Sequence, residues 1–481
     1  MLHAAQWLKR SRHKLKLNQF LRKLNKHIPT YALKKHGYLV ASSWSGKSEL
    51  IKLLIYRELI KQKPKEAVIL LDPHGDMAQE IAQFNEFNQT QYANRLVFID
   101  PSLKQGYSPS INPFELEVKT EENIALMTQE LLSIIKVLLQ WIGQSSSGSQ
   151  NQWSSTTNQM DAILSPCIAA LLRCGNSSFT DLQRFMDDNN NAGLLALGQQ
   201  SPNPQHKLLF RHKFNSPLFS ATKHWIYTRL QVILNDPTFQ NLISNTTTVN
   251  LKQLIEEKKI ILFKLSLGNA WSDSVQAYGR FIVGLLRIIA LQRTNIAIHK
   301  RVPILLFIDE FQNFISSDIE KALTQLRKYG LHLMLANQYV WQQITSALQK
   351  TLFASGVKIA GKNEKKSLSL LANEMELTVD ELKQLNTGEF YLQTANYPPI
   401  KIKTPKYLLW SQNAMPTKCW CNLVKQTLQH YYGKLNPHDW HNGLNHEIQN
   451  QKHNQHYVNQ QQVNPNTQLE NLNSKYHIEW D

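Results

Sequence analysis

The segment 38–51, which reads Tyr-Leu-Val-Ala-Ser-Ser-Trp-Ser-Gly-Lys-Ser-Glu-Leu-Ile, constrains the fold more than any other part of the chain. Its first three residues are apolar and predict the end of a buried strand. After Ser48, the side chains of Leu50, Leu53 and Leu54 recur at helical spacing. Gly-Lys-Ser in a turn between a strand and a helix is typical of a P-loop, so the segment predicts an α/β nucleotide-binding fold.

A P-loop binds phosphate because its successive backbone N–H groups and the positive end of the following helix face one small concavity. We expect Lys47 to reach the β- and γ-phosphates and the Ser48 hydroxyl to hold Mg²⁺. Ala41 replaces the usual first glycine, which is tolerable if its φ stays negative, whereas Gly46 is retained where the backbone must approach phosphate. A chance Gly-Lys-Ser in a surface turn is the alternative. The nucleotide-binding residues predicted from this loop are Ala41, Ser42, Ser43, Trp44, Ser45, Gly46, Lys47, Ser48 and Glu49.

A second signal for the same site lies in residues 304–310. A purely apolar run is followed by Asp309 and Glu310, which predicts a buried strand that brings two carboxylates to one edge of a sheet. We expect Asp309 to hold Mg²⁺ through water and Glu310 to polarise the water that attacks the γ-phosphate. Two acids in a solvated turn are the alternative. With Lys47 and Ser48, this pair predicts binding and hydrolysis of ATP or GTP together with Mg²⁺.

The next apolar segment, 331–336, ends at Asn337 and Gln338. An amide at this place can sense the γ-phosphate or orient the water, and the alternative is a polar residue in a turn. Arg327 precedes the segment and is a candidate for an arginine finger supplied to a neighbouring subunit. Further cationic candidates for that role are Lys328, Arg280, Arg287 and Arg293.

Strand and helix patterns alternate in two parts of the chain, which predicts an α/β fold with a parallel-rich central sheet. The part between them has helical periodicity without β-branched runs and predicts an inserted all-α domain. The last part is rich in Asn, Gln and His and predicts a polar, largely disordered tail. The predicted boundaries are 1–35 for a basic amino-terminal helix, 36–119 and 248–415 for the two halves of the nucleotide-binding domain, 120–247 for the insertion and 416–481 for the tail.

The chain carries a net charge of +17, from 53 Lys and Arg residues against 36 Asp and Glu. Such an excess favours a polyanionic partner, either nucleic acid or an anionic membrane surface, and a solubility preference is the alternative. Basic and aromatic residues interleave in the insertion, as in surfaces that hold phosphates and stack on bases. Helices with an aromatic core and solvated basic side chains explain the same pattern equally well. The candidate DNA-binding residues are Lys213, Lys223, Trp225 and Arg229.

Residues 1–35 place apolar side chains on one stripe of a basic helix, namely Leu17, Leu21, Leu24 and Ile28. Such a helix could lie on anionic lipid or DNA, or it could pack on the main domain with its basic face in solvent. No apolar run approaches the ~18 residues that span a bilayer, and no signal peptide is evident. The four cysteines have no zinc-site spacing and predict reduced thiols in a cytoplasmic chain. Any contact with a membrane is expected to be peripheral.

Several motifs together resemble the HerA/FtsK superfamily of ring-forming P-loop ATPases, and within it the TraG/TraD-type coupling proteins of conjugation and type IV secretion. The segments that carry the resemblance are 41–48, Asp-Pro-His-Gly-Asp at 72–76, Ile-Asn-Pro-Phe at 111–114, Phe-Ile-Asp-Glu-Phe-Gln-Asn-Phe at 307–314 and Leu-Ala-Asn-Gln-Tyr at 335–339. The resemblance covers roughly residues 36 to 405. Coupling proteins usually carry an amino-terminal transmembrane segment, in whose place only the basic helix is expected here.

The resemblance implies a RecA-like P-loop NTPase core that forms a homo-hexamer, with ATP and Mg²⁺ at subunit interfaces and DNA in a central channel. It assigns Lys47 and Ser48 to phosphate and Mg²⁺, Asp309 and Glu310 to the Walker B pair, and Gln338 to the sensor. Asp72 and Asp76 belong to a motif beside the site to which the sequence gives no role.

The function predicted is that of an ATP-driven DNA translocase which moves plasmid or other mobile-element DNA in conjugation or type IV secretion, with a relaxase or secretion channel as possible partners. Three alternatives stay open. They are a type IV secretion ATPase for assembly or export that does not act on DNA, a HerA-like DNA-processing helicase, and a non-catalytic nucleotide-binding adaptor.

Overall fold

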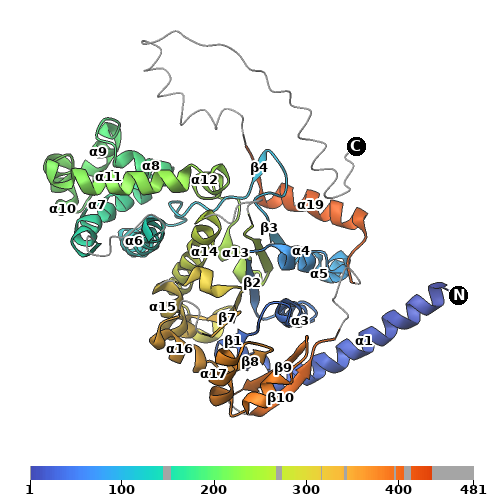
Figure 1. The fold of residues 1–481 in the computed structure, drawn as a ribbon. Coiled ribbons are helices and arrows are strands. Elements are labelled where there is room, and N and C mark those ends of the chain that lie inside the picture. Colours follow the sequence, from blue (N-terminus) through green and yellow to red (C-terminus); the bar gives the residue numbers. More distant parts are fainter. Residues whose placement is uncertain are drawn as a thin grey trace, which may run out of the picture. The chain divides into compact units, whose positions relative to one another are not determined.

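A mixed sheet of nine strands forms the centre of the molecule, in the order β10-β9-β8-β1-β7-β6-β2-β5-β3 (Figure 1). The structure is a computed structural model that describes residues 2–144, 153–266, 273–315, 317–340, 344–394, 397–405 and 413–435. The strands from β8 to β3 in this order run parallel, and β9 and β10 add an antiparallel edge. The strand bounds are β1 (Gly37–Val40), β2 (Ala67–Asp72), β3 (Leu96–Ile99), β5 (Ile260–Lys264), β6 (Ile304–Ile308), β7 (Leu331–Asn337), β8 (Val357–Gly361), β9 (Glu389–Thr394) and β10 (Tyr397–Lys403). The α/β fold with a parallel-rich sheet is therefore confirmed.

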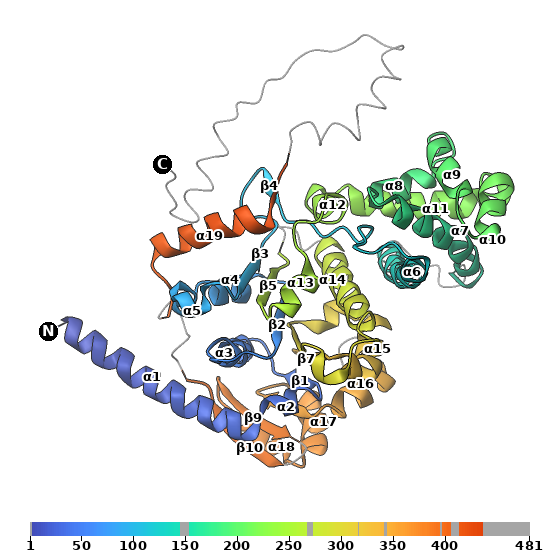
Figure 2. The same cartoon turned by 180° about the vertical axis from the view of Figure 1, so that it is seen from behind.

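Helices cover both faces of this sheet, which explains why its central strands are apolar on both sides (Figures 1 and 2). Successive residues of a strand point to opposite faces, so Leu39 joins one hydrophobic core and Val40 the other. The first core contains helices α3 (Lys47–Leu59) and α4 (Asp76–Ala82), and the second contains α14 (Asp273–Leu291) and α15 (Ser317–Gln325).

The carboxyl ends of four neighbouring parallel strands meet at one edge of the sheet. Val40 at the end of β1 is paired with Asn337 of β7, and Ile308 of β6 lies between Leu335 of β7 and Leu71 of β2. The segments that follow these strands therefore emerge side by side. They are the P-loop, the turn after β7, the acid pair and the turn that starts at Asp72.

The amino-terminal helix α1 (Leu2–His27) packs on the main domain along its apolar stripe. Leu17, Leu21 and Leu24 are buried in the same core as α3, and Lys23 donates a hydrogen bond to the carbonyl of Lys401 in β10 at 2.9 Å. The basic side chains from Lys14 onward are exposed on the other side of the helix. Packing on the domain, one of the interpretations left open by the sequence, is therefore observed.

The insertion is helical, as expected from its periodicity. Its elements are α6 (Glu121–Gln144), α7 (Trp153–Cys174), α8 (Phe179–Phe185), α9 (Ala192–Gln199), α10 (Pro204–Leu208), the π-helix η3 (Leu209–Lys213), α11 (Pro217–Leu234) and α12 (Pro237–Ser244). They lie between β4 (Tyr107–Ser108) and the short helix α13 (Leu251–Glu256) that precedes β5. Helix α6 packs against α14 and so anchors the insertion on the core.

The start of the predicted tail is ordered, in contrast to the sequence prediction. Helix α19 (Thr417–Tyr431) packs against β3, and the short strand β11 (Gly433–Lys434) pairs with β4. Few apolar residues suffice to fix this segment, because Val424, Leu428 and Tyr432 all face inward. Residues 436–481, for which disorder was also predicted, lie outside the described residues.

Helix α14 contradicts the expectation from the sequence that no apolar stretch approaches the length of a bilayer span. Ser274–Leu291 is long and apolar enough to cross a bilayer, and within the described ranges no other helix is. Most of this stretch is buried in the core, as expected for a central helix of a folded domain.

Candidate functional site

The P-loop has the local structure that its sequence predicts. Strand β1 ends at Val40, a turn follows, and α3 begins at Lys47 with Gly46 as its N-cap in the left-handed region, at φ 94°. A side chain at Gly46 would meet the backbone of Gly388, whose Cα would lie 3.1 Å from the added Cβ. The N–H of Gly388 also donates to the carbonyl of Ser45 at 2.7 Å. The loop is thus held from one side by the residue that precedes β9, and only glycine fits at position 46.

Two further residues shape the loop. The backbone N–H and the hydroxyl of Ser42 both donate to the carbonyl of Lys362 at 2.9 Å, which ties the loop to the end of β8. Trp44 has a left-handed backbone, at φ 63°, and its side chain is 94% exposed. Ala41 is buried and its φ is not positive, so its methyl group is accommodated as expected.

The Lys47 side chain joins the two parts of the site. Its Nζ lies 2.9 Å from Oδ1 of Asp309 and also forms an ion pair with Oε1 of Glu310, and all three side chains are buried. Burial by itself lowers the pKa of Lys47, but the charges of Asp309 and Glu310 outweigh it and the pKa is raised. The lysine is therefore a stable cation at the point where the P-loop faces the acid pair.

The Glu310 carboxylate is held by donors on both of its oxygens. Lys47 and the Gln338 amide donate to Oε1, the latter at 3.0 Å, and the Gln312 amide donates to Oε2 at 2.6 Å. Burial by itself raises the pKa of Glu310, but Lys47 and the two amides hold it below its ordinary value. Glu310 is consequently ionised near neutral pH, which is the state of a group that accepts a proton.

Gln312 was not predicted from the sequence. It lies in the 3-10 helix η5 (Phe311–Phe314), directly after β6, and its side chain turns back to the carboxylate two residues earlier. The left-handed backbone of Glu310, with φ 48° and ψ 47°, makes this return possible. The only available signal was an amide two residues after a strand-end glutamate.

The Asp72 carboxylate, whose role the sequence left open, builds the neighbouring turn. It is fully buried and accepts hydrogen bonds from the N–H groups of His74 at 3.1 Å and Ala78 at 2.8 Å. Burial, together with the charge of Asp309, raises the pKa of Asp72 to about 6. Asp76 is exposed at the start of α4. Asp72 therefore shapes the turn beside Asp309, whereas Asp76 has its side chain in solvent.

Ser48 and Glu49 lie in the first turn of α3. Ser48 is half-buried, and Glu49 forms an ion pair with Lys52 in the next turn. Burial raises the pKa of Glu49 above its ordinary value. The Glu49 side chain thus pairs within the helix, whereas Ser48 directly follows Lys47 at the start of α3.

The candidate arginine fingers differ in their surroundings. Arg327 and Lys328 are exposed in the 3-10 helix η6 (Leu326–Tyr329), which precedes β7 and so lies at the opposite edge of the sheet from the P-loop. Two other candidates are buried and ion-paired within the chain, Arg287 with Glu130 at 2.6 Å and Arg293 with Glu256 at 3.0 Å. Arg280 donates to the carbonyl of Asn313 at 3.1 Å.

The four candidate DNA-binding residues of the insertion do not form one exposed surface. Lys223 is 1% exposed, forms an ion pair with Asp188 and lies over the ring of Phe214 at 5.0 Å. Lys223 therefore stabilises the interior of the insertion and cannot reach a phosphate. The prediction was wrong because the charge pattern of the sequence does not show that Asp188 is its partner. Lys213 is exposed, and the Arg229 guanidinium stacks on Trp225 at 3.6 Å, both half-buried.

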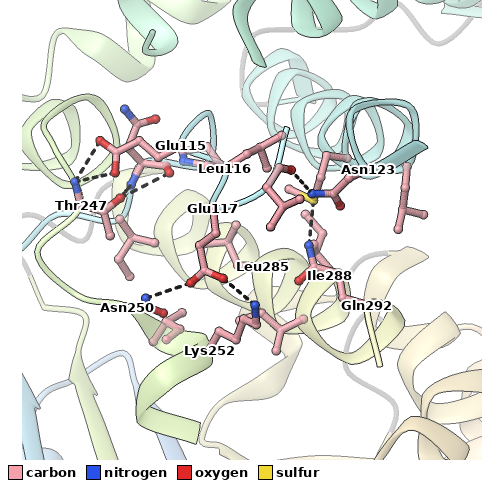
Figure 3. Close-up of a pocket in the computed structure, with 18 of the residues that line it drawn as sticks. Glu115, Leu116, Glu117, Asn123, Thr247, Asn250, Lys252, Leu285, Ile288 and Gln292 are labelled. Carbon is pink, nitrogen blue, oxygen red and sulfur yellow. Dashed lines mark hydrogen bonds and ion pairs between the residues drawn. The ribbon is translucent and has the colours of Figure 1, made fainter. Parts of the chain in front are cut away.

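A pocket of about 800 Å³ lies away from the residues described above (Figure 3). It is bounded by residues 111–127, by residues 247–252 and by the end of α14. Glu115 accepts hydrogen bonds from the N–H of Thr247, and Glu117 accepts from Asn250 at 3.3 Å and from Lys252 at 2.6 Å (Figure 3). No residue of the P-loop or the acid pair lines this pocket.

Two family models match segments of the chain. The model of the central domain of the helicase HerA matches residues 28–212, and the model of the TraM recognition site of TraD and TraG matches residues 303–368. The second segment contains the acid pair and Gln338. No curated protein sequence matches the chain.

Solved structures of bacterial coupling proteins share the fold. The conjugative coupling protein TrwBdeltaN70 superposes with a TM-score of 0.56 at 14% identity, over 81% of this chain and 89% of that one. The plasmid coupling protein TrwB in complex with a non-hydrolysable ATP analogue gives 0.54 at 15% identity over the same shares, and TrwB in complex with ADP and Mg²⁺ gives 0.53 at 15% over 78% and 86%. The resemblance to HerA/FtsK-type ATPases of the TraG/TraD kind, and the RecA-like core that it implies, are confirmed.

Proposed function

We propose that this protein is an ATPase of the coupling-protein type, which uses ATP hydrolysis to move DNA of a plasmid or another mobile element. The observation that carries the proposal is the convergence of Lys47, Asp309 and Glu310 at the carboxyl edge of the sheet. A P-loop NTP hydrolase requires a P-loop lysine and a Walker B pair at one site, and here these side chains are in contact.

The residues at this edge fit a nucleotide with Mg²⁺. The left-handed Gly46 and the start of α3 present backbone N–H groups for the β-phosphate, and Lys47 supplies the charge for the β- and γ-phosphates. The hydroxyl of Ser48 and the carboxylate of Asp309 are the hard oxygen donors that Mg²⁺ prefers, and they would hold it. Bound there, Mg²⁺ neutralises charge on the phosphate oxygens.

Hydrolysis then depends on Glu310. Lys47 forms an ion pair with this carboxylate, so phosphate binding has to draw the lysine away from it. Glu310, still held by Gln312 and Gln338, is then a free acceptor for the proton of the attacking water. Gln338 connects this acceptor to the end of β7 and can respond to the γ-phosphate.

DNA and a ring of subunits belong to the proposal. A net charge of +17 favours a polyanion, and the exposed Lys213 with the stacked Trp225 and Arg229 offers cationic and aromatic groups for sequence-independent contact. The position of Arg327 on the edge opposite the P-loop is compatible with a finger that acts on a neighbouring subunit in a homo-hexamer. We place the protein in the cytoplasm, in contact with a relaxase or a secretion channel at the membrane.

A type IV secretion ATPase that moves protein instead of DNA is the second candidate. One observation favours it. The insertion buries Lys223, so the basic surface expected there is smaller than the sequence suggested.

ATP hydrolysis by the purified protein tests these functions. It is measured without nucleic acid, with single-stranded DNA and with duplex DNA, at low and moderate salt, beside Glu310→Gln. A several-fold stimulation by DNA that fades with salt and disappears in the variant supports the DNA motor. Hydrolysis that is indifferent to DNA supports the export ATPase, and nucleotide binding without hydrolysis supports the adaptor.

A further inference from the structure

We propose that Gln312 is a positioning residue for hydrolysis, which holds the Glu310 carboxylate in the orientation that faces the P-loop. The inference rests on the proposed function. It adds to the site a residue that neither the sequence motifs nor the comparisons assign.

The contact itself is the first observation. Gln312 is 6% exposed and donates from Nε2 to Oε2 of Glu310 at 2.6 Å. Lys47 and Gln338 both bind the other oxygen, Oε1. Since phosphate would draw Lys47 away, Gln312 and Gln338 are the two groups that keep the carboxylate from rotating, one on each oxygen.

The backbone supports the same conclusion. Glu310 is held in the left-handed region at φ 48°, which is a costly conformation for a residue other than glycine, and its N–H donates to Oδ1 of Asp309 at 3.0 Å. This conformation brings the start of η5 back over the end of β6, so that the side chain of Gln312 reaches the carboxylate. A strained backbone that places one amide on one carboxylate is typical of a site where position matters.

Within the described residues, the other polar atom of the Gln312 amide makes no comparable contact. Its carbonyl oxygen Oε1 is buried and accepts no hydrogen bond from any residue in the described part of the chain. Flipping the amide would turn that oxygen toward an ionised carboxylate, so the orientation with Nε2 on Glu310 is the favourable one. A buried acceptor without a partner is unfavourable, and an apolar side chain of the same length would avoid it.

The experiment compares wild type with Gln312→Met, which keeps the length of the side chain but removes the donor and the unpaired acceptor. Gln325→Met, on an exposed glutamine at the end of α15, is the matched control. The readouts are kcat and KM for ATP, the Kd for ATP by calorimetry, and the melting temperature of the nucleotide-free protein.

We expect Gln312→Met to lower kcat on the order of tenfold and to leave KM and Kd within about twofold, because the Gln312 amide binds the proton acceptor Glu310. The melting temperature should fall somewhat, because the buried Oε2 of Glu310 loses a charge-assisted hydrogen bond. A merely structural role predicts that KM and Kd weaken along with kcat, and that pattern would overturn the inference.

A double-mutant cycle with Glu310→Ala provides the second test. If Gln312 acts through Glu310, Gln312→Met should have no further effect on kcat in the Glu310→Ala background. An undiminished effect there, or an unchanged kcat in the single variant, would overturn the inference while the proposed ATPase stands. A wild-type protein that hydrolyses no ATP would overturn both.

Discussion

At the scale of single residues, the site depends on backbone conformations that most side chains disfavour. Gly46, Trp44 and Glu310 all have positive φ, and they flank the point where Lys47 meets the acid pair. For a non-glycine residue such a conformation costs about 1–2 kcal/mol. The burial of apolar side chains in the cores on both faces of the sheet offsets this cost. The strained residues mark the site, where the positions of the side chains matter more than local stability.

Gly46→Ala should destabilise the protein and abolish nucleotide binding. The alanine backbone would have to keep φ 94°, and its Cβ would lie 3.1 Å from Cα of Gly388. We expect the free energy of unfolding to fall by about 1–2 kcal/mol, measured by urea denaturation, with loss of ATP binding in calorimetry. Gly193→Ala is the control, because nothing lies within 4 Å of its added Cβ. Equal effects of the two substitutions would contradict the role given to Gly46.

The site residues that the sequence revealed share one property. Lys47, Asp309 and Gln338 each follow a strand of a parallel sheet, and the carboxyl ends of neighbouring strands meet at one edge, so pattern alone brings them together. The position of Gln312 depends instead on a left-handed residue before it, which no periodicity predicts. Lys223 shows the same limit, since a buried ion pair and a solvated basic side chain have the same sequence pattern.

At the scale of elements, the two ends of the parallel strands have different chemistry. The carboxyl edge holds the acid pair, while the amino edge of β1 and β7 holds two buried histidines, His36 and His332. The N–H of Leu333 donates to Nδ1 of His36 at 2.9 Å, which requires that nitrogen to be unprotonated. The strand composition predicted the sheet, but not this polar contact at the start of β1.

The amino edge should make the protein sensitive to acid. Burial, with the charge of Arg327, lowers the pKa of His36 from 6.5 to about 4, and burial likewise lowers the pKa of His332 to about 3. The unfolded chain therefore takes up protons first as the pH falls below 6.5. The contribution of neutral His36 to the free energy of unfolding is complete above pH 6.5 and is lost as the pH falls from 6.5 to 4. At pH 5 the loss is about 2 kcal/mol.

His36→Asn tests this effect, since Asn tolerates a positive φ and its Oδ1 can accept the bond from Leu333. We expect the variant to lose about 2 kcal/mol less than wild type between pH 7 and pH 5 in urea denaturation. His430→Asn, on an exposed histidine of α19, is the matched control for the substitution itself. Parallel pH curves for wild type and His36→Asn would contradict the assignment.

The ordered start of the carboxyl-terminal segment depends on one phenol. The hydroxyl of Tyr432 is buried after β3, where it accepts from the N–H of Asp100 at 2.8 Å and donates to the carbonyl of Asp100 at 3.0 Å. The Asn, Gln and His content predicted a largely disordered tail. It could not reveal this attachment, which relies on polar bonds to the backbone and on a few inward side chains.

Tyr432→Phe should therefore destabilise the protein, since it leaves the buried N–H of Asp100 without its acceptor, while the carbonyl of Asp100 still accepts from the N–H of Leu103 at 3.0 Å. The expected loss is about 1–3 kcal/mol in the free energy of unfolding. Tyr431→Phe is the matched control, because the neighbouring ring is only half-buried and its role in pairing is through its carbonyl. Similar losses for both variants would show that ring burial, and not the hydroxyl, fixes α19.

At the scale of the whole molecule, the distribution of cations is compatible with a ring. Arg287 and Arg293 form ion pairs within the chain. Arg327, in contrast, is exposed at the edge of the sheet opposite Glu310. An arginine in that place cannot act on the nucleotide of its own subunit. If it stabilises the transition state at all, it has to do so on a neighbouring copy, and the active unit is then an interface between two chains.

Mixing two inactive variants tests this arrangement. Arg327→Ala should lower kcat on the order of a thousandfold while ATP affinity is retained, and Glu310→Gln should be inactive for lack of the proton acceptor. In a mixed ring, some interfaces combine Glu310 from an Arg327→Ala subunit with Arg327 from a Glu310→Gln subunit, so the mixture should hydrolyse ATP faster than either variant alone. Lys328→Ala, next to Arg327 and equally exposed, is the control and should remain active. A mixture that assembles but stays as inactive as its components would mean that the finger is another residue, because complementation requires only that the two groups come from different chains.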